Sequence, residues 1–525
     1  MNIKEAKEEI RNTLRAYHRR DAAGRYLYPQ VRQRPILLIG PPGIGKTAIM
    51  EQVAAECGVG LVAYTITHHT RQSAIGLPQI VSRSYDGREV SVTEYTLSEI
   101  VASVYDCMER TGRREGILFI DEINCVSETL APVMLQFLQN KTFGNHRIPE
   151  RWMIVAAGNP AEYNKSVREF DIVTLDRVRR IDVEADCGVW MEYAYQQEVH
   201  GAIMSYLAIH GDHFYLVECN ADEKHFVTAR GWEDLSEILK SYEALGVEVT
   251  EKLVIQYLQK RGIAREFAAY YRLYVKYGTD YGIDDVLDGR IAPRLLHSEY
   301  QDKVHMAQSG SFEERFTVIG LLLDALSQNF VLFERMYRRV RLLSDGLNGL
   351  ENTLKAQETI QGFGAYLQER RRKLSVKVRM ELIPPAEAEL EELVLCELER
   401  WNEMLRGEHI SDKQEGQQRL HTLLGQEEAV LAARAKELQE RLERAFRFAA
   451  DCFGPQQEMV LLVSGLTRNA RAAWFISEYG CEPYFYYSRQ LLCCDEEKLR
   501  LACRDALGRR CGGEKKDQQK SARLS

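Results

Sequence analysis

A glycine-rich run that follows a short apolar segment carries the clearest chemistry in this sequence. The segment Ile36–Ile39 precedes a run that reads Gly40-Pro41-Pro42-Gly43-Ile44-Gly45-Lys46-Thr47-Ala48. Its spacing is G-x-x-x-x-G-K-[ST], and its glycines let backbone N–H groups turn toward a phosphate chain, because glycine tolerates positive φ and has no Cβ. Lys46 is expected to reach the β- and γ-phosphates, and the Thr47 hydroxyl to ligate Mg²⁺. The run, with Ala48 behind it, predicts a site for a nucleoside triphosphate and Mg²⁺.

Polar side chains end two further apolar runs. Asp121 and Glu122 follow the run 117–120, and Asn159 follows the run 153–157. At the carboxyl edge of a sheet Asp121 can hold Mg²⁺ through water, and Glu122 can orient or deprotonate an attacking water. The Asn159 carboxamide can bond the γ-phosphate or that water, although an asparagine before Pro160 could equally be a turn residue. Together these side chains predict hydrolysis of the triphosphate.

Alternating strands and helices are expected to position these groups. We predict helices over 3–20, 46–57, 96–110 and 127–140, and strands over 36–39, 61–66, 117–121 and 152–157. Such alternation predicts a parallel sheet between helices. A tight turn is expected at Gly144-Asn145, just before the last strand.

A hairpin is predicted between the second strand and the helix over 96–110. Asp86-Gly87 is a strong two-residue turn signal between the runs 80–85 and 88–93. Pairing across this turn puts an apolar strip on one face of the hairpin, formed by Val81, Tyr85, Val90 and Val92. The strip could face a partner, or the hairpin could be a solvated decoration.

The second half of the chain reads as helices. Short helices are expected over 190–300, and long helices follow from about residue 310. Apolar residues recur at helical or coiled-coil spacing in two stretches: Leu390, Val394, Leu398, Trp401 and Leu405, then Leu431, Ala435, Leu438, Leu442, Ala445 and Ala449. Pro384-Pro385 and the polar segment 407–416 break these helices and favour an antiparallel helical hairpin. We expect an N-terminal helix and linker (1–34), a nucleotide-binding domain (35–189), a helical lid (190–305), a helical C-terminal domain (306–511) and a disordered tail (512–525).

The composition of the chain limits which classes of partner and which cell compartment we expect. The formal charge is 69 − 77 = −8, which argues against nucleic acid as the default partner. No stretch of 18 apolar residues occurs and the N-terminus is highly charged, so we expect a cytoplasmic protein without a membrane segment. The twelve cysteines form no C-x-x-C pair. Five fall late, at Cys481, Cys493, Cys494, Cys503 and Cys511, and reduced thiols are favoured over a zinc site.

Five motifs in order make residues 35–240 resemble the AAA+ ATPases, and more narrowly their MoxR-like branch. They are GPPGIGKT at 40–47, LFIDEIN at 118–124, AAGNP at 156–160, LDRVRR at 175–180 and TARGWEDL at 228–235, with Ala74–Pro78 fitting the segment before the family's hairpin insert. The resemblance implies an α/β P-loop NTPase with an AAA+ core and an all-α lid. The helical spacing from about residue 310 adds a long helical C-terminal extension to this fold class. The resemblance implies Asn159 as the first sensor, Arg177 as the arginine finger that reaches a neighbouring subunit, and Arg230 as the second sensor. Arg179 and Arg180 lie close to Arg177, and Val178 stands where the family more often has an aromatic residue.

The resemblance also implies a function and a kind of partner. The expected protein is an ATPase that forms a hexameric ring and uses ATP and Mg²⁺ to remodel a protein client or activate it in a chaperone-like way. MoxR-like proteins often work with a partner that carries a von Willebrand factor A domain. Two alternatives stay open: a nucleic-acid-dependent motor or restriction-type NTPase, and a slow switch whose nucleotide state gates scaffold binding.

Overall fold

The computed structural model describes residues 1–490 except 69, 144–145, 164–166, 168–169, 220–223, 292–296, 355–359 and 381. The predicted turn at Gly144-Asn145, the predicted disordered tail 512–525, and Cys493, Cys494, Cys503 and Cys511 lie outside the described residues. The chain divides into two compact units. The first contains Met1–Tyr193, His210–Glu266 and Gly362–Asn402, and the second contains Ala194–Ile209, Phe267–Gln361 and the chain from Glu403. The predicted domain boundaries stay predictions.

A five-stranded sheet organises the first unit. Its strands are β1 (Ile36–Ile39), β2 (Gly60–Thr65), β5 (Gly116–Asp121), β8 (Trp152–Gly158) and β9 (Arg179–Asp182), in the order β2-β5-β8-β1-β9. Every neighbouring pair is parallel, which confirms the predicted parallel sheet. The sequence analysis did not predict β9. This edge strand reads Arg-Arg-Ile-Asp, and only Ile181 on it faces the core.

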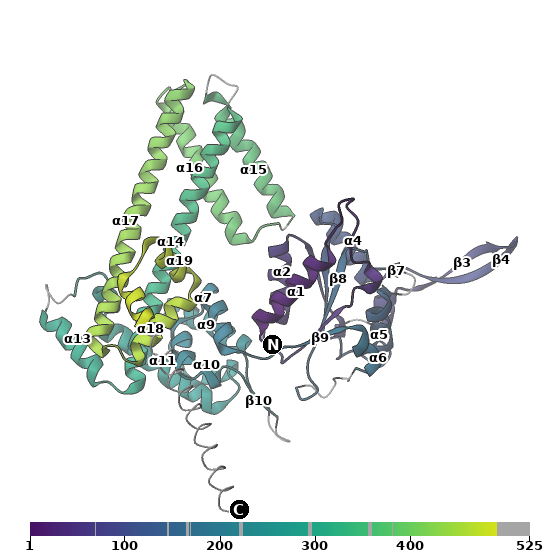
Figure 1. The fold of residues 1–525 in the computed structure, drawn as a ribbon, viewed down its shortest axis with the longest axis horizontal. Coiled ribbons are helices and arrows are strands. Elements are labelled where there is room, and N and C mark those ends of the chain that lie inside the picture. The colour runs from purple at the N-terminus through teal and green to yellow at the C-terminus, as the bar shows by residue number, and fades with distance from the viewer. Residues whose placement is uncertain are drawn as a thin grey trace, which may run out of the picture. The chain divides into compact units, whose positions relative to one another are not determined.

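Helices cover both faces of this sheet (Figure 1). On one face, α1 (Ile3–Tyr17) and α2 (Lys46–Cys57) pack their apolar residues with Ile36 and Leu38. On the other face, α4 (Glu99–Thr111) and α5 (Ala131–Asn140) pack with Leu37, and with β5 and β8. Burial on both faces explains why the central strands read as continuous apolar runs. The smaller elements of this region are α3 (Arg71–Ile75), β6 (Thr142–Phe143), β7 (His146–Arg147) and α6 (Ile172–Arg177), with 3₁₀ turns at Gln30–Arg32 and Ile66–His68.

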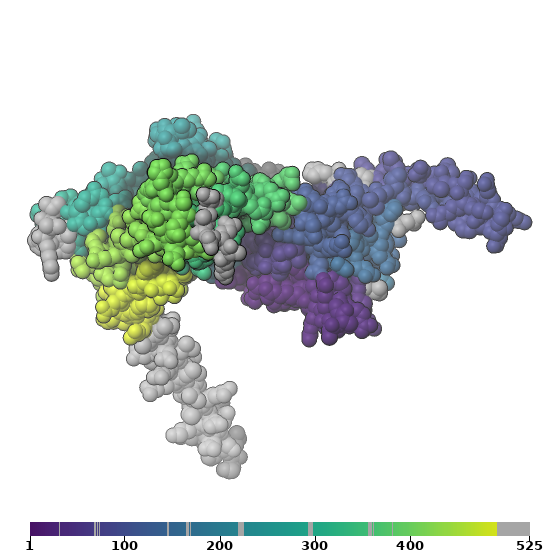
Figure 2. All heavy atoms as spheres, turned by 90° about the horizontal axis from the view of Figure 1, so that it is seen from above, coloured from purple at the N-terminus to yellow at the C-terminus, as the bar shows by residue number. Residues whose placement is uncertain are grey.

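The predicted hairpin is present and projects from the sheet and helices of the first unit (Figures 1 and 2). It consists of β3 (Pro78–Tyr85) and β4 (Arg88–Tyr95), each two residues longer at its base than predicted. Val81 pairs with Val92, so the strip predicted on one face is confirmed. Asp86 and Gly87 both have positive φ, at 49° and 78°, as the turn between twisted strands requires.

The remaining elements of the first unit differ from the predicted all-α lid in one respect. They are α7 (Cys187–Gln196), β10 (Leu216–Cys219), β11 (Lys224–Val227), α9 (Ala229–Leu245) and α10 (Glu251–Tyr257), with a 3₁₀ turn at Gly211–His213. The expectation of an all-α lid is wrong in one respect, because β10 and β11 form an antiparallel pair. Each strand is only four residues long and carries apolar side chains that the sequence analysis assigned to short helices.

The predicted break at Pro384-Pro385 separates two helices, α15 (Phe363–Arg379) and α16 (Pro385–Gly407). Charge complementarity holds the two helices together. Arg371 of α15 lies 2.6 Å from Glu392 and 2.9 Å from Glu399 of α16, and Lys377 lies 3.1 Å from Glu391.

Two long antiparallel helices dominate the second unit. These are α14 (Phe312–Thr353) and α17 (Lys413–Phe453). Ion pairs fix their direction: Arg339 lies 3.4 Å from Glu427, and Glu351 lies 2.8 Å from His421. All six residues of the seam predicted in 431–449 are buried. The other elements of the unit are α8 (Gly201–Ile209), α11 (Arg261–Tyr281), α12 (Ile283–Leu287), α13 (His297–Ser309), α18 (Gln457–Arg468) and α19 (Ala470–Tyr479), with a 3₁₀ turn at Ile360–Gly362.

Helix α14 is long and apolar enough to cross a membrane by length and composition alone. Its most apolar window is 61% buried inside the structure, as expected for a core helix. This one helix is weak evidence for a membrane span, and the expected absence of a membrane segment stays a prediction.

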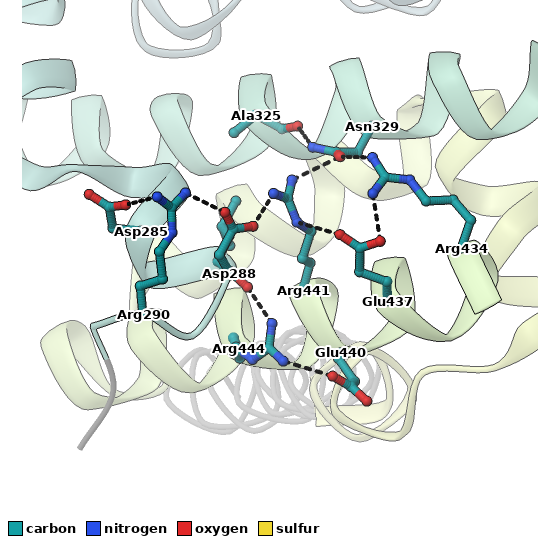
Figure 3. Close-up of polar contacts among 11 residues, drawn as sticks. Asp285, Asp288, Arg290, Ala325, Asn329, Arg434, Glu437, Glu440, Arg441 and Arg444 are labelled. Carbon is teal, nitrogen blue, oxygen red and sulfur yellow. Dashed lines mark hydrogen bonds and ion pairs between the residues drawn. The ribbon is translucent and has the colours of Figure 1, made fainter. Parts of the chain in front are cut away.

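A polar network ties the turn after α12 to α14 and α17 (Figure 3). The Arg441 guanidinium donates to Asp288 and, at 2.8 Å, to Asn329 Oδ1. Arg444 donates to the carbonyl of Leu287 at 2.5 Å and to Glu440 at 2.8 Å. Arg441 thereby links the turn after α12 to Asn329 of α14, and Arg444 adds a second link between α17 and that turn.

Candidate functional site

The glycine-rich run forms a loop that connects β1 to α2. Gly43 and Gly45 have φ of 75° and 90°, which side chains rarely adopt. A Cβ on Gly40 would lie 2.8 Å from the carbonyl oxygen of Val183, so the close approach of β9 also requires glycine there. Gly45 caps α2 without a side-chain hydrogen bond. The first N–H groups of α2 therefore remain available to an anion, and the helix dipole favours one there.

Lys46 is buried in this loop and makes three hydrogen bonds. Its ammonium donates to the carbonyls of Gly40 at 2.8 Å and Pro41 at 2.9 Å, and to Asn159 Oδ1 at 2.9 Å. Burial lowers the pKa of Lys46 to about 8, because desolvation disfavours the charged amine. The negative charge of Asp121 partly opposes this shift, and the positive charge of Arg230 adds to it. The amine that is expected to meet the phosphates already lies against the end of β8.

Thr47 and Asp121 lie side by side at the end of β5. The Thr47 hydroxyl donates to Asp121 Oδ2 over 3.2 Å, and the other carboxylate oxygen accepts the backbone N–H of Glu122. A hydroxyl and a carboxylate oxygen at this separation form the hard oxygen donor set that Mg²⁺ prefers. The residues therefore fit the predicted magnesium site.

Glu122 has a partner that the sequence analysis missed. Glu122 has φ of 57°, and its Oε2 accepts a hydrogen bond of 2.8 Å from the Thr67 hydroxyl. Thr67 follows the end of β2, and β2 pairs with β5 so that Thr65 lies beside Asp121. A polar residue just beyond the carboxyl end of a strand was the available signal, but the sequence alone does not show which strands are neighbours.

A cavity of ≈ 530 Å³ lies beside the loop. Its lining includes Gly40 and Pro41 from the loop, Asn159 from the end of β8, and Arg180 and Asp182 from β9. The carboxyl ends of parallel strands are where open α/β sheets bind their ligands.

Residues 35–178 match the family model described as "AAA domain (dynein-related subfamily)". These residues form an AAA ATPase domain. Such a domain implies ATP hydrolysis. The strand order of the sheet and the geometry of the glycine-rich loop agree with this assignment of residues 35–178.

Other proteins are similar to this chain over shorter or more divergent stretches. The "ATP-dependent protease ATPase subunit HslU" of Jannaschia sp. (strain CCS1) is 30% identical over 107 residues, which are 20% of this chain and 24% of that protein. The chain thus spans about a quarter of this curated relative. The FIGL-1 AAA domain in complex with ADP is 18% identical, with 45% of this chain and 64% of that chain covered and a TM-score of 0.23. A crystal structure from Cytophaga hutchinsonii ATCC 33406 is 16% identical, covers 34% of this chain and 46% of that chain, and has a TM-score of 0.20.

Arg177 lies apart from the loop of the AAA domain, exposed at the end of α6. Its neighbours are engaged within the chain: Arg179 donates to Thr13 at 2.7 Å, and Arg180 donates to Asp182 at 2.8 Å. Among the described carboxylates, none forms an ion pair with Arg177. The structure therefore does not bring Arg177 to the loop of its own chain.

Arg230 lies in the first turn of α9, whose start packs against the loop of the AAA domain. The Thr228 side chain caps α9 by accepting the N–H of Gly231, and a Cβ on Gly43 would lie 3.2 Å from the Thr228 Cβ. Nearby, Tyr215 donates its hydroxyl proton to the carbonyl of Pro42 at 3.0 Å. These contacts place Arg230 beside the site, on an element that is separate from the sheet.

Proposed function

We propose that the chain is a ring-forming, MoxR-like AAA+ ATPase that couples hydrolysis of ATP, with Mg²⁺, to remodelling or chaperone-like activation of a protein client. The observation that carries this proposal is the split between two sets of site residues. Lys46, Asp121, Glu122 and Asn159 gather at the loop, whereas Arg177 is exposed and forms no ion pair with a described carboxylate. An exposed arginine is suited to meet the nucleotide of a second copy of the chain.

In this proposal each residue of the site has a role. When bound, Mg²⁺ supplies charge neutralisation at the phosphates, and Thr47 and Asp121 would hold it. Lys46 and the N–H groups at the start of α2 bind the triphosphate. Glu122 takes a proton from the attacking water, and Asn159 orients that water or the γ-phosphate. Arg230 senses the γ-phosphate from α9, and Arg177 of one subunit offsets charge at the site of its neighbour.

Client and partner belong to the same proposal. The exposed strip of the β3–β4 hairpin and the long helices α14 and α17 offer surfaces to a protein such as one with a von Willebrand factor A domain. A hexameric ring in the cytoplasm is the assembly that this proposal favours. Capture of partners by a Glu122→Gln variant in cells tests this part.

Mixing two inactive variants tests the shared site. Glu122→Gln should bind ATP as wild type does and hydrolyse it at least ~10²-fold more slowly. Arg177→Ala should bind ATP normally and lose hydrolysis by ~10³-fold or more. Their mixture should regain activity, because some interfaces join an intact arginine to an intact glutamate.

The matched control is Arg25→Ala, since Arg25 is an exposed arginine that pairs with Asp21 within the chain and does not line the cavity beside the loop. This variant should keep most of its activity. If mixed rings of confirmed composition stay inactive at every ratio, Arg177 does not act across an interface, and the proposed ring mechanism is wrong.

A further inference from the structure

Asn124 is a buried polar residue that the proposed mechanism does not yet use. It follows β5 by three residues and is only 5% exposed. Its carboxamide meets the backbone of Asn159 twice. Nδ2 donates to the carbonyl of Asn159 at 2.8 Å, and Oδ1 accepts the N–H of Asn159 at 3.2 Å. One side chain thus satisfies both polar backbone groups of a single residue.

Neighbouring backbone groups support this contact. A Cβ on Gly158 would lie 2.6 Å from Asn124 Oδ1, so glycine at this position lets the carboxamide approach. The N–H of Ile123 donates to the carbonyl of Ala157 at 2.9 Å, which continues the pairing of β5 with β8 past the end of β5. Asn124 is therefore held from its own backbone as well as through its side chain.

The contact between Asn124 and Asn159 lies next to the groups that are predicted to react. The Asn159 carboxamide accepts a hydrogen bond from Lys46 at 2.9 Å. Two side-chain torsions separate that carboxamide from the backbone that Asn124 holds. Because hydrogen bonds weaken steeply with distance and angle, a shift of the Asn159 backbone would misplace its side chain.

We propose that Asn124 is a positioning residue for ATP hydrolysis, which fixes the Asn159 backbone so that the Asn159 carboxamide meets Lys46 and the γ-phosphate or attacking water. This inference rests on the proposed function, since it assigns Asn159 a part in hydrolysis. Asn124 itself touches neither substrate nor metal in this role.

A double-mutant cycle tests the inference. We would measure kcat, the Kd for ATP and the melting temperature of Asn124→Ala, Asn159→Ala and the double variant. Asn124→Ala should lower kcat by about 10- to 100-fold, the scale of misplacing one polar group at a reacting centre, and change the Kd by less than about threefold. In the Asn159→Ala background the same substitution should lower kcat by less than about twofold, because the group that it positions is already gone.

Two further variants separate positioning from general packing. Val126→Ala removes a buried apolar side chain from the same segment and should lower the melting temperature while leaving kcat near wild type. Asn124→Ser keeps a neutral hydroxyl beside the Asn159 backbone and buries no charge. It should fold even if the alanine variant does not, and it should show an intermediate loss of kcat with the Kd unchanged.

The outcomes distinguish this inference from the proposed function. If Asn159→Ala keeps wild-type kcat, the role of Asn159 in the proposed function is wrong. If Asn159→Ala slows hydrolysis while Asn124→Ala and Asn124→Ser do not, the positioning role is wrong and the proposed function stands. Losses that multiply in the double variant would also overturn the positioning role.

Discussion

The buried amine of Lys46 predicts that ATP binding takes up a proton above pH 8. Burial sets the pKa of Lys46 at about 8 in the free protein, and a bound polyanion favours the charged amine and raises this pKa. The affinity for ATP therefore falls as the pH rises. Below pH 8 the ammonium is already present and affinity is full, whereas above pH 8 binding must first protonate the amine. If the neutral amine contributes little, the apparent Kd rises by a factor of 1 + 10^(pH − 8). Between pH 7 and pH 9 this weakens binding about tenfold, or about 1.4 kcal/mol.

Calorimetry in two buffers with different ionisation enthalpies measures both quantities, with Mg²⁺ in excess. We expect uptake of about one proton per ATP at pH 9 and about a tenth of a proton at pH 7. Lys141 is the necessary control, because burial also lowers its pKa to about 8. Lys141→Met should keep the proton uptake. Lys46→Arg should abolish it in whatever binding survives, because a guanidinium stays charged. An affinity that is flat from pH 7 to pH 9, with no proton uptake, would refute the reasoning.

Three other predictions concern the glutamate, the hairpin and the helical unit. Thr67→Val should raise basal ATP turnover by up to about tenfold, because it frees the Glu122 oxygen that accepts the Thr67 hydroxyl proton. Slower turnover in a steady-state assay would instead mean that Thr67 orients Glu122 productively. Replacing residues 79–93 by a short glycine linker should leave basal turnover within about twofold and remove client stimulation, and a collapse of the melting temperature would instead identify the strip as core. Arg441→Ala should destabilise the chain by about 1–3 kcal/mol in urea unfolding, since it takes away a mostly buried partner of Asp288; an unchanged midpoint would show that the network in Figure 3 is dispensable.

The central strands and helices of the AAA domain could be predicted because their burial leaves a local signal. Strand 36–39 and helix 46–57 have the predicted bounds, since an apolar run and a glycine-rich loop mark both ends. The edge strand β9 and the pair β10–β11 lacked such a signal. The edge strand β9 pairs with a strand far away in sequence, with Leu38 beside Ile181, whereas β10 and β11 pair with each other but are only four residues long.

The same distinction applies to the site and to the long helices. Lys46, Thr47 and Asp121 lie in motifs whose spacing predicts their proximity, and the structure brings them together. Thr67 and Asn124 are recognisable only once the register of β2, β5 and β8 is known. The buried seam of α17 was predicted from spacing, but its partner α14 was not, because α15 and α16 lie between the two in sequence.

The contacts of the site indicate why hydrolysis would depend on assembly. Lys46 bonds the Asn159 carboxamide, and Glu122 bonds the Thr67 hydroxyl, so the predicted phosphate ligand and general base each have a partner within the chain. A triphosphate competes for Lys46 by charge and would release Asn159 from it. Nothing in that exchange acts on Glu122 or supplies the cation that Arg177, at the end of α6, offers elsewhere. Under the proposed ring mechanism, a single chain would bind ATP with its own groups, and fast hydrolysis would require a second copy to bring its arginine.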